Sequence, residues 1–508
     1  MDPTETREAL TLPETHSRLL LKGWCPVRGV GHPLRLGLMA VVVVASLSCQ
    51  DSDAGGEAES TFEALVAGYV QAWQGFYPER AAALGLADYR DRTGDRSPEG
   101  IQLWVALNDS ILERVAAAPA TLPLDLRIDL RLVRNQGRAE IARWKEAGGG
   151  QDGSRSEGAP ADFPMGRDAY AAALVRYYDM EVTPEEVAER ALEEIRQVRR
   201  LMAETAAEHW VATHAQAPGS PTPPPDDEDA LVAWALDEME KARASTQQES
   251  LELFIRFADE AEAFVREAGI ATLPPERTLD IVLTPATAGP AQRIGFVDPA
   301  PPFDPTGRTV LSIPTIEDTL PEAEKEDFYR SFNNHFNKAI IVHELFPGHY
   351  MQAKIAAANP RPARSLFPYE PYIEGWATLV EKIALDAGWD DRNRLTYLAH
   401  LRKRLENANR AYTSVQVHCN GWTEEQVMRF SVEESLVAPQ FAKSLWGRLE
   451  RSPMQVTSYF IGADLLRRIL ESEKARLGEA FDVRAFNDAV LRAGPVPFDL
   501  IGEVLVSG

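Results

Sequence analysis

Apolar residues recur at intervals of three and four along most of this chain, the spacing that gives a helix one buried face. The pattern covers residues 61–147, follows Thr183, and returns from Glu322 to the C-terminus. Pro184 and Glu186 stand one and three positions after Thr183, where a first-turn proline and a capping-box glutamate start a helix. We therefore expect a mostly α-helical fold.

Three short runs rich in β-branched residues interrupt the helical pattern between residues 273 and 316. They read LDIVLTP, RIGFVDP and RTVLSIPTI, and proline and glycine punctuate them, as is typical of strands. The sequence predicts a small β-sheet here. An edge strand of such a sheet can pair with an extended peptide backbone. A purely structural hairpin is the alternative.

Two segments with little apolar surface divide the helical regions. Residues 148–164 are rich in Gly and Ser, and residues 216–229 are rich in Pro and Asp. Because the regions on either side are alike, we interpret both segments as surface loops within one fold. The expected organisation is a leader with a polar linker over residues 1–58 and a single helical domain, with a small β subdomain, over residues 59–508. A domain boundary at either loop is the alternative.

The first part of the chain has the features of an export signal. Residues 36–47 form an apolar run after Arg28 and Arg35 that is too short to span a bilayer. The run leads to Cys49 and a polar stretch, which resembles a bacterial lipoprotein signal with Cys49 as the lipidated residue. An ordinary cleaved signal or a short membrane anchor is the alternative. In each case we expect export, to the periplasm or the cell surface.

Composition narrows the choice of partners. Over 508 residues, 53 Lys and Arg stand against 77 Asp and Glu, which gives a net charge of −24. Nucleic acid and anionic lipid repel a chain with this negative charge, and we expect neither as a partner. We expect contact with a membrane only through a lipid on Cys49. Cys25 and Cys49 lie in the leader, which leaves Cys419 with no partner for an intramolecular disulfide.

The stretch that indicates chemistry most clearly is IIVHELFPGHYMQ, residues 340–352. His343 and His349 offer imidazole nitrogens to a cation, and Glu344 offers a carboxylate that can take a proton from water. These are the parts of a zinc-dependent hydrolase. Metal-dependent hydrolysis is therefore the working hypothesis for this protein.

The spacing of the two histidines requires an interrupted helix. Six positions correspond to about 240° around a regular helix, so a straight helix would not bring both rings to one metal ion. Pro347 has no N–H and clashes with the carbonyl of His343, and Gly348 tolerates unusual dihedral angles. We expect a broken turn that directs His349 toward His343.

Two motifs in this order resemble a known family. HELFPGHYMQ, followed by YIEGWATLVE at residues 372–381, is similar to the paired HExxPGH and EGWA motifs of the domain-of-unknown-function 885 family, a bacterial group regarded as zinc metallopeptidases. The resemblance extends over most of the chain from Phe62, with weaker matches in residues 76–92, 421–426 and 458–466. The resemblance implies a large helical metallopeptidase-like body around a cleft. It also implies that the protein cleaves short peptides.

A zinc site needs a third protein ligand, and the resemblance assigns this role to Glu374 in the EGWA motif. In helical zinc peptidases a glutamate on the following helix completes the site. Glu381 lies seven residues later, on nearly the same helix face. It is a candidate to accept a hydrogen bond from a ligand histidine. A surface ion pair is the alternative for Glu381.

Polar residues of the C-terminal third are candidates for contacts with the substrate. His418 matches the histidine of a family motif that usually reads D-T-G-x-H, although Ser414 and the two residues after it depart from that motif. His418 or Tyr459 would stabilise the developing oxyanion. Arg410 or Arg448 would bind a substrate carboxylate. A purely structural role is the alternative for each.

These assignments predict a peptidase with one zinc ion held by His343, His349 and Glu374. Glu344 is the expected general base, with His418 or Tyr459 as the second donor to the scissile carbonyl. One alternative is a lipid-anchored, non-catalytic binding protein with a structural or vestigial metal site. A second is an amide hydrolase that acts on cell-wall peptides.

Overall fold

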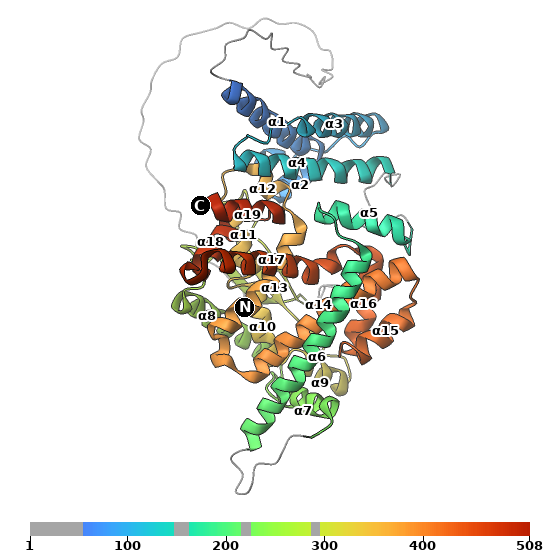
Figure 1. Ribbon diagram of the computed structural model, residues 1–508, viewed down its shortest axis with the longest axis vertical. Helices are drawn as coiled ribbons and strands as arrows, with labels where there is room; N and C mark the ends of the chain where they lie inside the picture. The colour runs from blue at the N-terminus through green and yellow to red at the C-terminus, as the bar shows by residue number, and fades with distance from the viewer. Residues whose placement is uncertain (1–53, 147–161, 215–224, 286–294, 508) are drawn as a thin grey trace, which may run out of the picture. The chain divides into compact units, whose positions relative to one another are not determined.

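Helices make up most of the described chain, which in this computed structural model comprises residues 54–146, 162–214, 225–285 and 295–507 (Figure 1). Contacts group Asp53–Gly508 into one unit. The predicted apolar leader run and Cys49 lie outside the described residues, as do most of the two predicted loops. The first helix begins at Ala54, within the last residues of the predicted leader and linker of residues 1–58.

The first helices pack around buried aromatic side chains. Glu140 is buried among them and accepts hydrogen bonds from the Tyr77 hydroxyl and from Trp104 Nε1, the latter at 2.8 Å. Ser97 caps the third helix by accepting from the N–H of Gly100. The elements are α1 (Ala54–Phe76), α2 (Pro78–Ala83), η1 (Ala87–Tyr89), α3 (Pro98–Ala116), α4 (Leu124–Ile141) and η2 (Ala142–Glu146).

The longest helix begins at the predicted capping box. The N–H of Thr183 donates to the Glu186 carboxylate at 3.0 Å, and the N–H of Glu186 donates to Thr183 Oγ1 at 3.2 Å. These bonds satisfy N–H groups that the first turn leaves without helical partners. The helices of this region are α5 (Arg167–Tyr178), α6 (Pro184–His214), α7 (Glu228–Lys241) and α8 (Gln247–Ala268).

A small sheet follows α8, as the β-branched runs predict. Its strands are β1 (Leu279–Leu283), β2 (Phe296–Asp298) and β3 (Thr309–Ile313), in the order β1-β3-β2. β1 is parallel to β3, whereas β2 is antiparallel to it. The sheet is therefore not a simple hairpin, and β2 is an edge strand.

Helices form the remaining part of the chain. They are α9 (Glu322–Ser331), α10 (Asn334–Glu344), α11 (His349–Ala357), α12 (Pro362–Leu366), α13 (Glu370–Ala387), η3 (Trp389–Arg392), α14 (Arg394–Asn420), α15 (Glu424–Glu433), α16 (Pro439–Arg451), α17 (Gln455–Leu477), η4 (Gly478–Ala480), α18 (Val483–Ala493) and α19 (Phe498–Ser507). Among the residues described, no helix combines the length and the apolarity needed to cross a bilayer.

Two glycines allow α13 and α17 to cross in close contact at the centre of this body (Figure 1). A Cβ added to Gly375 of α13 would lie 2.6 Å from the backbone of Gly462 in α17. A Cβ on Gly462 would lie 2.3 Å from the carbonyl oxygen of Pro371. Glu374 and Tyr459 stand beside this crossing, so the glycine pair sets the distance between the helices that carry them.

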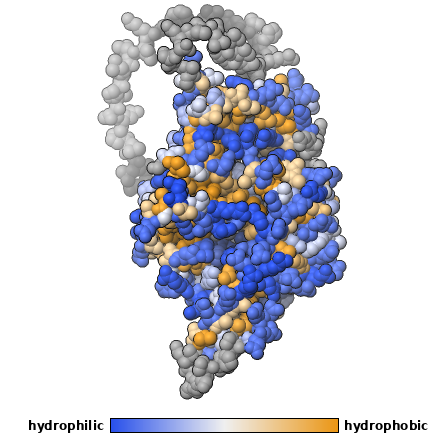
Figure 2. All heavy atoms as spheres, in the orientation of Figure 1, coloured by the Kyte–Doolittle hydropathy of each residue, from blue (hydrophilic) through white to orange (hydrophobic). Residues whose placement is uncertain are grey.

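The fold class predicted from the sequence, mostly helical with a small sheet, is confirmed. Hydrophilic residues cover most of the face seen in Figure 2, and hydrophobic residues gather mainly in its upper half. This surface agrees with a chain in which 26% of residues are charged.

Candidate metal centre

The chain breaks between α10 and α11, where the sequence predicts an interrupted turn. α10 ends at Glu344 and α11 begins at His349, with a cis peptide bond between Phe346 and Pro347. A Cβ on Gly348 would lie only 1.7 Å from the carbonyl oxygen of His343, so this close approach requires glycine.

Trp376 holds the broken turn in place. It is fully buried in α13, and its Nε1 donates to the carbonyl oxygen of Pro347 at 3.0 Å. The turn brings the rings of His343 and His349 to a centroid distance of 4.8 Å, nearly perpendicular to each other. The tryptophan of the EGWA motif therefore supports the geometry of the two histidines.

His343, His349 and Glu374 form a cluster that can hold a metal ion. Glu374 Oε2 lies 3.5 Å from Nε2 of His343 and 3.4 Å from Nε2 of His349. The ligand atoms of all three lie within 4.8 Å of one another, and no other His, Cys, Asp or Glu cluster of this kind occurs among the described residues. Tetrahedral zinc, with bonds of about 2.0–2.1 Å, separates its ligand atoms by about 3.3 Å.

One oxygen of Glu374 faces the two histidines without a hydrogen bond. Glu374 Oε2 is buried and has no hydrogen-bond partner within the described ranges, whereas Oε1 accepts from Gln455 Nε2 at 3.3 Å. A buried carboxylate oxygen at this distance from two imidazole nitrogens is compensated either by a protonated histidine or by a cation that all three groups share. The donor set and its spacing therefore fit a divalent cation of the zinc type.

Glu381 fixes the orientation of His343. Its buried carboxylate accepts from Nδ1 of His343 at 2.8 Å, from Nδ1 of His400 at 2.9 Å and from Nζ of Lys403 at 2.8 Å. Because Nδ1 of His343 donates its proton to Glu381, Nε2 carries a lone pair. This lone pair can bind a cation that His343 shares with Glu374. Glu381 is only 2% exposed, so its alternative interpretation as a surface ion pair is wrong.

The charges around the cluster shift the pKa values of its members. Burial opposes the charged forms, but Lys403 and the histidines hold the pKa of Glu381 well below its usual value. The pKa of Glu374 is likewise lowered by His343 and His349 despite burial. Burial also favours neutral His349, yet the Glu374 carboxylate outweighs it and raises the pKa of His349 to about 9.

The cluster lines a cavity of about 610 Å³. Glu344, the predicted general base, lines the same cavity, as do Arg410 and Arg448. Tyr459 is also in its wall, and its hydroxyl accepts from Gln455 Nε2 at 3.2 Å. Burial and the Glu374 charge raise the pKa of Tyr459 to about 12, so this side chain keeps its proton at neutral pH.

The two arginines flank the ring of Tyr459. The guanidinium carbons of Arg410 and Arg448 lie 4.7 Å and 5.5 Å from its centroid. Arg410 is paired with the Glu406 carboxylate. Arg448 donates to the uncharged Gln455 at 3.0 Å, and no ion pair to a carboxylate involves it among the described residues. Of the two, Arg448 retains the greater capacity to bind a substrate anion.

His418 lies away from this site, so its assignment as an oxyanion donor is wrong. Its Nδ1 accepts from the N–H of Met165 at 3.2 Å, and its Nε2 donates to the carbonyl oxygen of Leu449 at 3.0 Å. The ring is 1% exposed and stacks on Tyr170. Both nitrogens are used in packing α14 against its neighbours, which leaves none for a substrate.

Sequence reasoning missed several residues that support the site. His400 and Lys403 share the Glu381 carboxylate, and Gln455 joins Glu374 to Tyr459. Gln455 stands four positions before Tyr459 on one helix, so helical spacing could have suggested it. No local signal connects His400 to Glu381, because they lie on different helices.

The protein is thus a helical body in which buried His343 meets half-buried His349 and Glu374 at a cavity. The chain belongs to the family described as bacterial protein of unknown function (DUF885), which it matches over residues 147–505. The family resemblance stated from the motifs is thereby confirmed. No curated protein matches this chain.

Solved structures share the fold. A candidate lipoprotein of unknown function from Shewanella oneidensis matches with a TM-score of 0.73 and 17% identity, over 88% of this chain and 99% of that chain. A candidate lipoprotein from Colwellia psychrerythraea matches with a TM-score of 0.56 and 18% identity, over 80% of this chain and 69% of that chain. At these identities, the likeness concerns the fold alone.

Proposed function

We propose that this protein is a zinc-dependent hydrolase that cleaves short peptides. The observation that supports the proposal most strongly is the buried oxygen of Glu374, which lies 3.5 Å and 3.4 Å from Nε2 of His343 and His349 and has no hydrogen bond within the described residues. These three side chains would hold the cation. When bound, it would supply the Lewis acidity that hydrolysis of an amide requires.

The chain's own residues would move the proton and bind the substrate. Glu344 lines the same cavity and is the candidate base, because its carboxylate can hold the proton that an attacking water loses and deliver it to the leaving amine. Tyr459 keeps its hydroxyl proton at neutral pH and can donate it in a hydrogen bond to a developing oxyanion.

The edge strand in the wall of the cavity supports a peptide substrate. Gly295, Phe296 and Val297, at the start of edge strand β2, line the cavity together with the metal cluster. No other strand of the described chain pairs with the outer edge of β2. An extended peptide added to this edge would bring its backbone carbonyl groups toward the cluster without selecting a particular side chain.

We also propose that the protein is exported and anchored by a lipid on Cys49. The apolar run of residues 36–47 before this cysteine supports the proposal. Both solved relatives are described as candidate lipoproteins, which agrees with this assignment.

Digestion of a peptide library by matched variants tests the hydrolase proposal. Glu344→Gln should keep the bound metal but lower the rate of hydrolysis by roughly 10²–10⁴-fold, because only the proton acceptor is removed. Glu424→Gln, an exposed change on α15, should keep the parent rate. If Glu344→Gln were as active as the parent, Glu344 would not be the base.

The rival proposal is a binding protein with a structural metal site. The open cavity of about 610 Å³ beside the cluster favours the hydrolase, because structural zinc sites are closed by four protein ligands. Metal retention without cleavage of any peptide in the library would favour the rival.

A further inference from the structure

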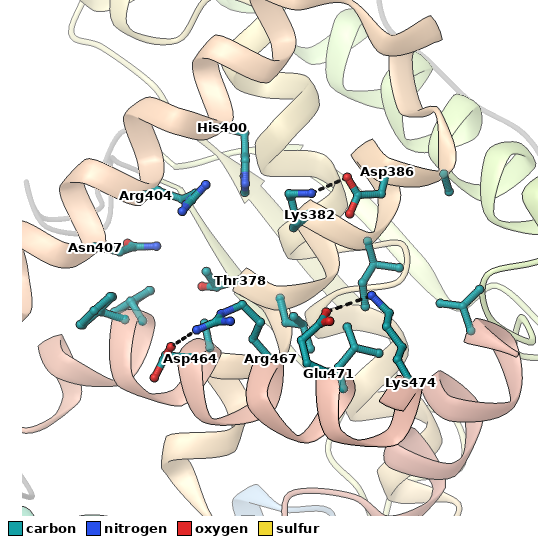
Figure 3. A pocket seen from close by; sticks show the side chains of 18 of the residues that line it. Thr378, Lys382, Asp386, His400, Arg404, Asn407, Asp464, Arg467, Glu471 and Lys474 are labelled. Carbon is teal, nitrogen blue, oxygen red and sulfur yellow. Dashed lines mark hydrogen bonds and ion pairs between the residues drawn. The ribbon is translucent and has the colours of Figure 1, made fainter. Parts of the chain in front are cut away.

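A second cavity, of about 420 Å³, lies among α13, α14 and α17 (Figure 3). This volume is in the range that holds small-molecule ligands. Most of its wall is apolar, and the residues that contribute include Ile270, Leu379, Ile383, Phe460, Leu470 and Phe481.

The second cavity is distinct from the metal cavity. Asn407 and Tyr459 line both, so these two side chains stand between them. His343, His349 and Glu374 line only the metal cavity. A ligand of the second cavity therefore does not depend on the presence of a metal ion.

Four buried polar atoms in the wall of the second cavity have no hydrogen-bond partner in the described part of the chain. One of them, Oδ2 of Asp464, forms ion pairs with Arg190 and Arg468. The other three are Nε2 of His400, Oγ1 of Thr378 and Nδ2 of Asn407, and their residues are 1%, 8% and 4% exposed. Figure 3 shows the three side chains directed into the space between the helices. A buried polar atom without a partner destabilises the fold, so three in one cavity indicate a ligand that satisfies them.

The chemistry of these atoms specifies what the ligand must offer. Nδ1 of His400 donates to Glu381 at 2.9 Å, so Nε2 of the neutral ring is an acceptor. Oδ1 of Asn407 accepts from Arg410 at 3.0 Å, which identifies Nδ2 as a free donor. A hydroxyl group both donates and accepts, so it matches the His400 acceptor on α14 together with the Thr378 hydroxyl on α13.

The charged residues at the second cavity balance one another. Each basic side chain is paired with an acidic one, and Figure 3 shows three of the pairs. The pairs are Lys382 with Asp386, Arg404 with Glu194, Arg467 with Asp464 and Lys474 with Glu471. A ligand with a net charge would have to separate one of these pairs, so the cavity favours an uncharged molecule.

We propose that the second cavity is a binding site for an uncharged small molecule with an apolar body and one hydroxyl group. The apolar wall takes the body, and the hydroxyl donates to His400 Nε2 while it accepts from Thr378 Oγ1. The proposal is independent of the hydrolase function, because none of the three cation ligands takes part.

Calorimetric titration of the full chain with 4-ethylphenol tests the proposal. We expect a dissociation constant below about 1 mM, which a ligand of this size reaches when it is largely buried. Ethylbenzene, which lacks the hydroxyl, and 4-ethylbenzoate, which carries a charge, should each bind about three- to tenfold more weakly. A 4-ethylphenol concentration of about 5 mM is roughly five times the expected upper limit of the dissociation constant. Absence of binding at this concentration would overturn the proposal.

Two substitutions and one control substitution locate the binding. Thr378→Val keeps the side-chain volume and removes the hydroxyl, so it should weaken 4-ethylphenol about three- to tenfold and leave ethylbenzene unchanged. Thr205→Val, another buried threonine in a helix but outside this cavity, should change neither. Ala463→Phe, which fills the cavity from α17, should abolish binding of both. Parent-like 4-ethylphenol affinity in either Thr378→Val or Ala463→Phe would contradict the assignment.

Discussion

Glu381 accepts a hydrogen bond from Nδ1 of His343 at 2.8 Å, and this contact joins α13 to the end of α10. The same carboxylate neutralises Lys403, which is itself buried. One buried side chain therefore orients a candidate metal ligand and compensates a buried cation.

Glu381→Gln should lower the affinity for zinc by roughly 10–100-fold, because the amide no longer fixes the ring of His343 with a charged acceptor. Competition with a chelating dye measures the change. Glu344→Gln is the matched control, since Glu344 holds no ligand in place and its removal should leave the affinity unchanged. Equal affinity in Glu381→Gln and the parent would mean that His343 does not depend on this contact.

Zinc binding should release a proton at neutral pH. In the metal-free protein the pKa of His349 is raised to about 9, so the ring is charged at pH 7 and must lose its proton to bind metal. Affinity should rise with pH up to about 9, and the heat of binding should depend on the ionisation heat of the buffer. Identical heats in phosphate and Tris would contradict a charged His349.

The same shift makes the metal-free protein sensitive to alkali. A raised pKa means that the folded chain holds the His349 proton more tightly than the unfolded chain does. This contribution to stability is complete below about pH 6.5, the ordinary histidine pKa, and is lost as the pH rises through about 9. Urea unfolding of chelator-treated protein between pH 6 and pH 10 measures it, with His349→Gln as the control that lacks the contribution.

Gly375→Ala should destabilise the protein by about 1–3 kcal/mol, because the new methyl group meets the backbone of Gly462 at 2.6 Å. Gly68→Ala is the matched control. Gly68 is an exposed helical glycine with nothing within 4 Å of an added Cβ, so its replacement should stabilise by about 0.5–1 kcal/mol. Urea unfolding distinguishes the two, and equal effects would contradict the close crossing of α13 and α17.

His418 should contribute to loss of stability in acid. Burial lowers the pKa of His418, so the folded protein resists a proton that the unfolded chain accepts near its ordinary pKa of about 6.5. The penalty is absent above that pH and grows as the pH falls below it.

His418→Gln should therefore be less stable than the parent at pH 8, because buried hydrogen bonds are lost, and should show a shallower decline between pH 7 and pH 5. Its zinc affinity should equal that of the parent, because His418 lies outside the metal cavity. A loss of zinc in a variant that remains folded would contradict this placement.

Local rules predicted the elements and the break before His349. Helical spacing and the Thr183 capping box required only neighbouring residues, as did the interruption at Pro347 and Gly348. The order of the strands could not be predicted in this way, because the parallel pairing of β1 with β3 depends on contacts between distant segments.

The roles of the residues that surround the site also depend on contacts between distant segments, which local rules do not predict. Lys403 belongs to the run HLRKR, which in the sequence has the appearance of a solvated basic face. It is buried because Glu381, on another helix, accepts its charge. The predicted role of His418 was wrong for the opposite reason. His418 matched one position of a family motif, but both of its ring nitrogens form hydrogen bonds in the packing between helices.

The zinc content of the purified protein and of Glu374→Gln is the sharpest test of the metal centre. We expect one zinc per parent chain and per chain of the exposed control Glu424→Gln, and little zinc in Glu374→Gln at the same protein concentration. Equal zinc in all three, or none in the parent after equilibration with zinc at neutral pH, would contradict a metal centre formed by His343, His349 and Glu374.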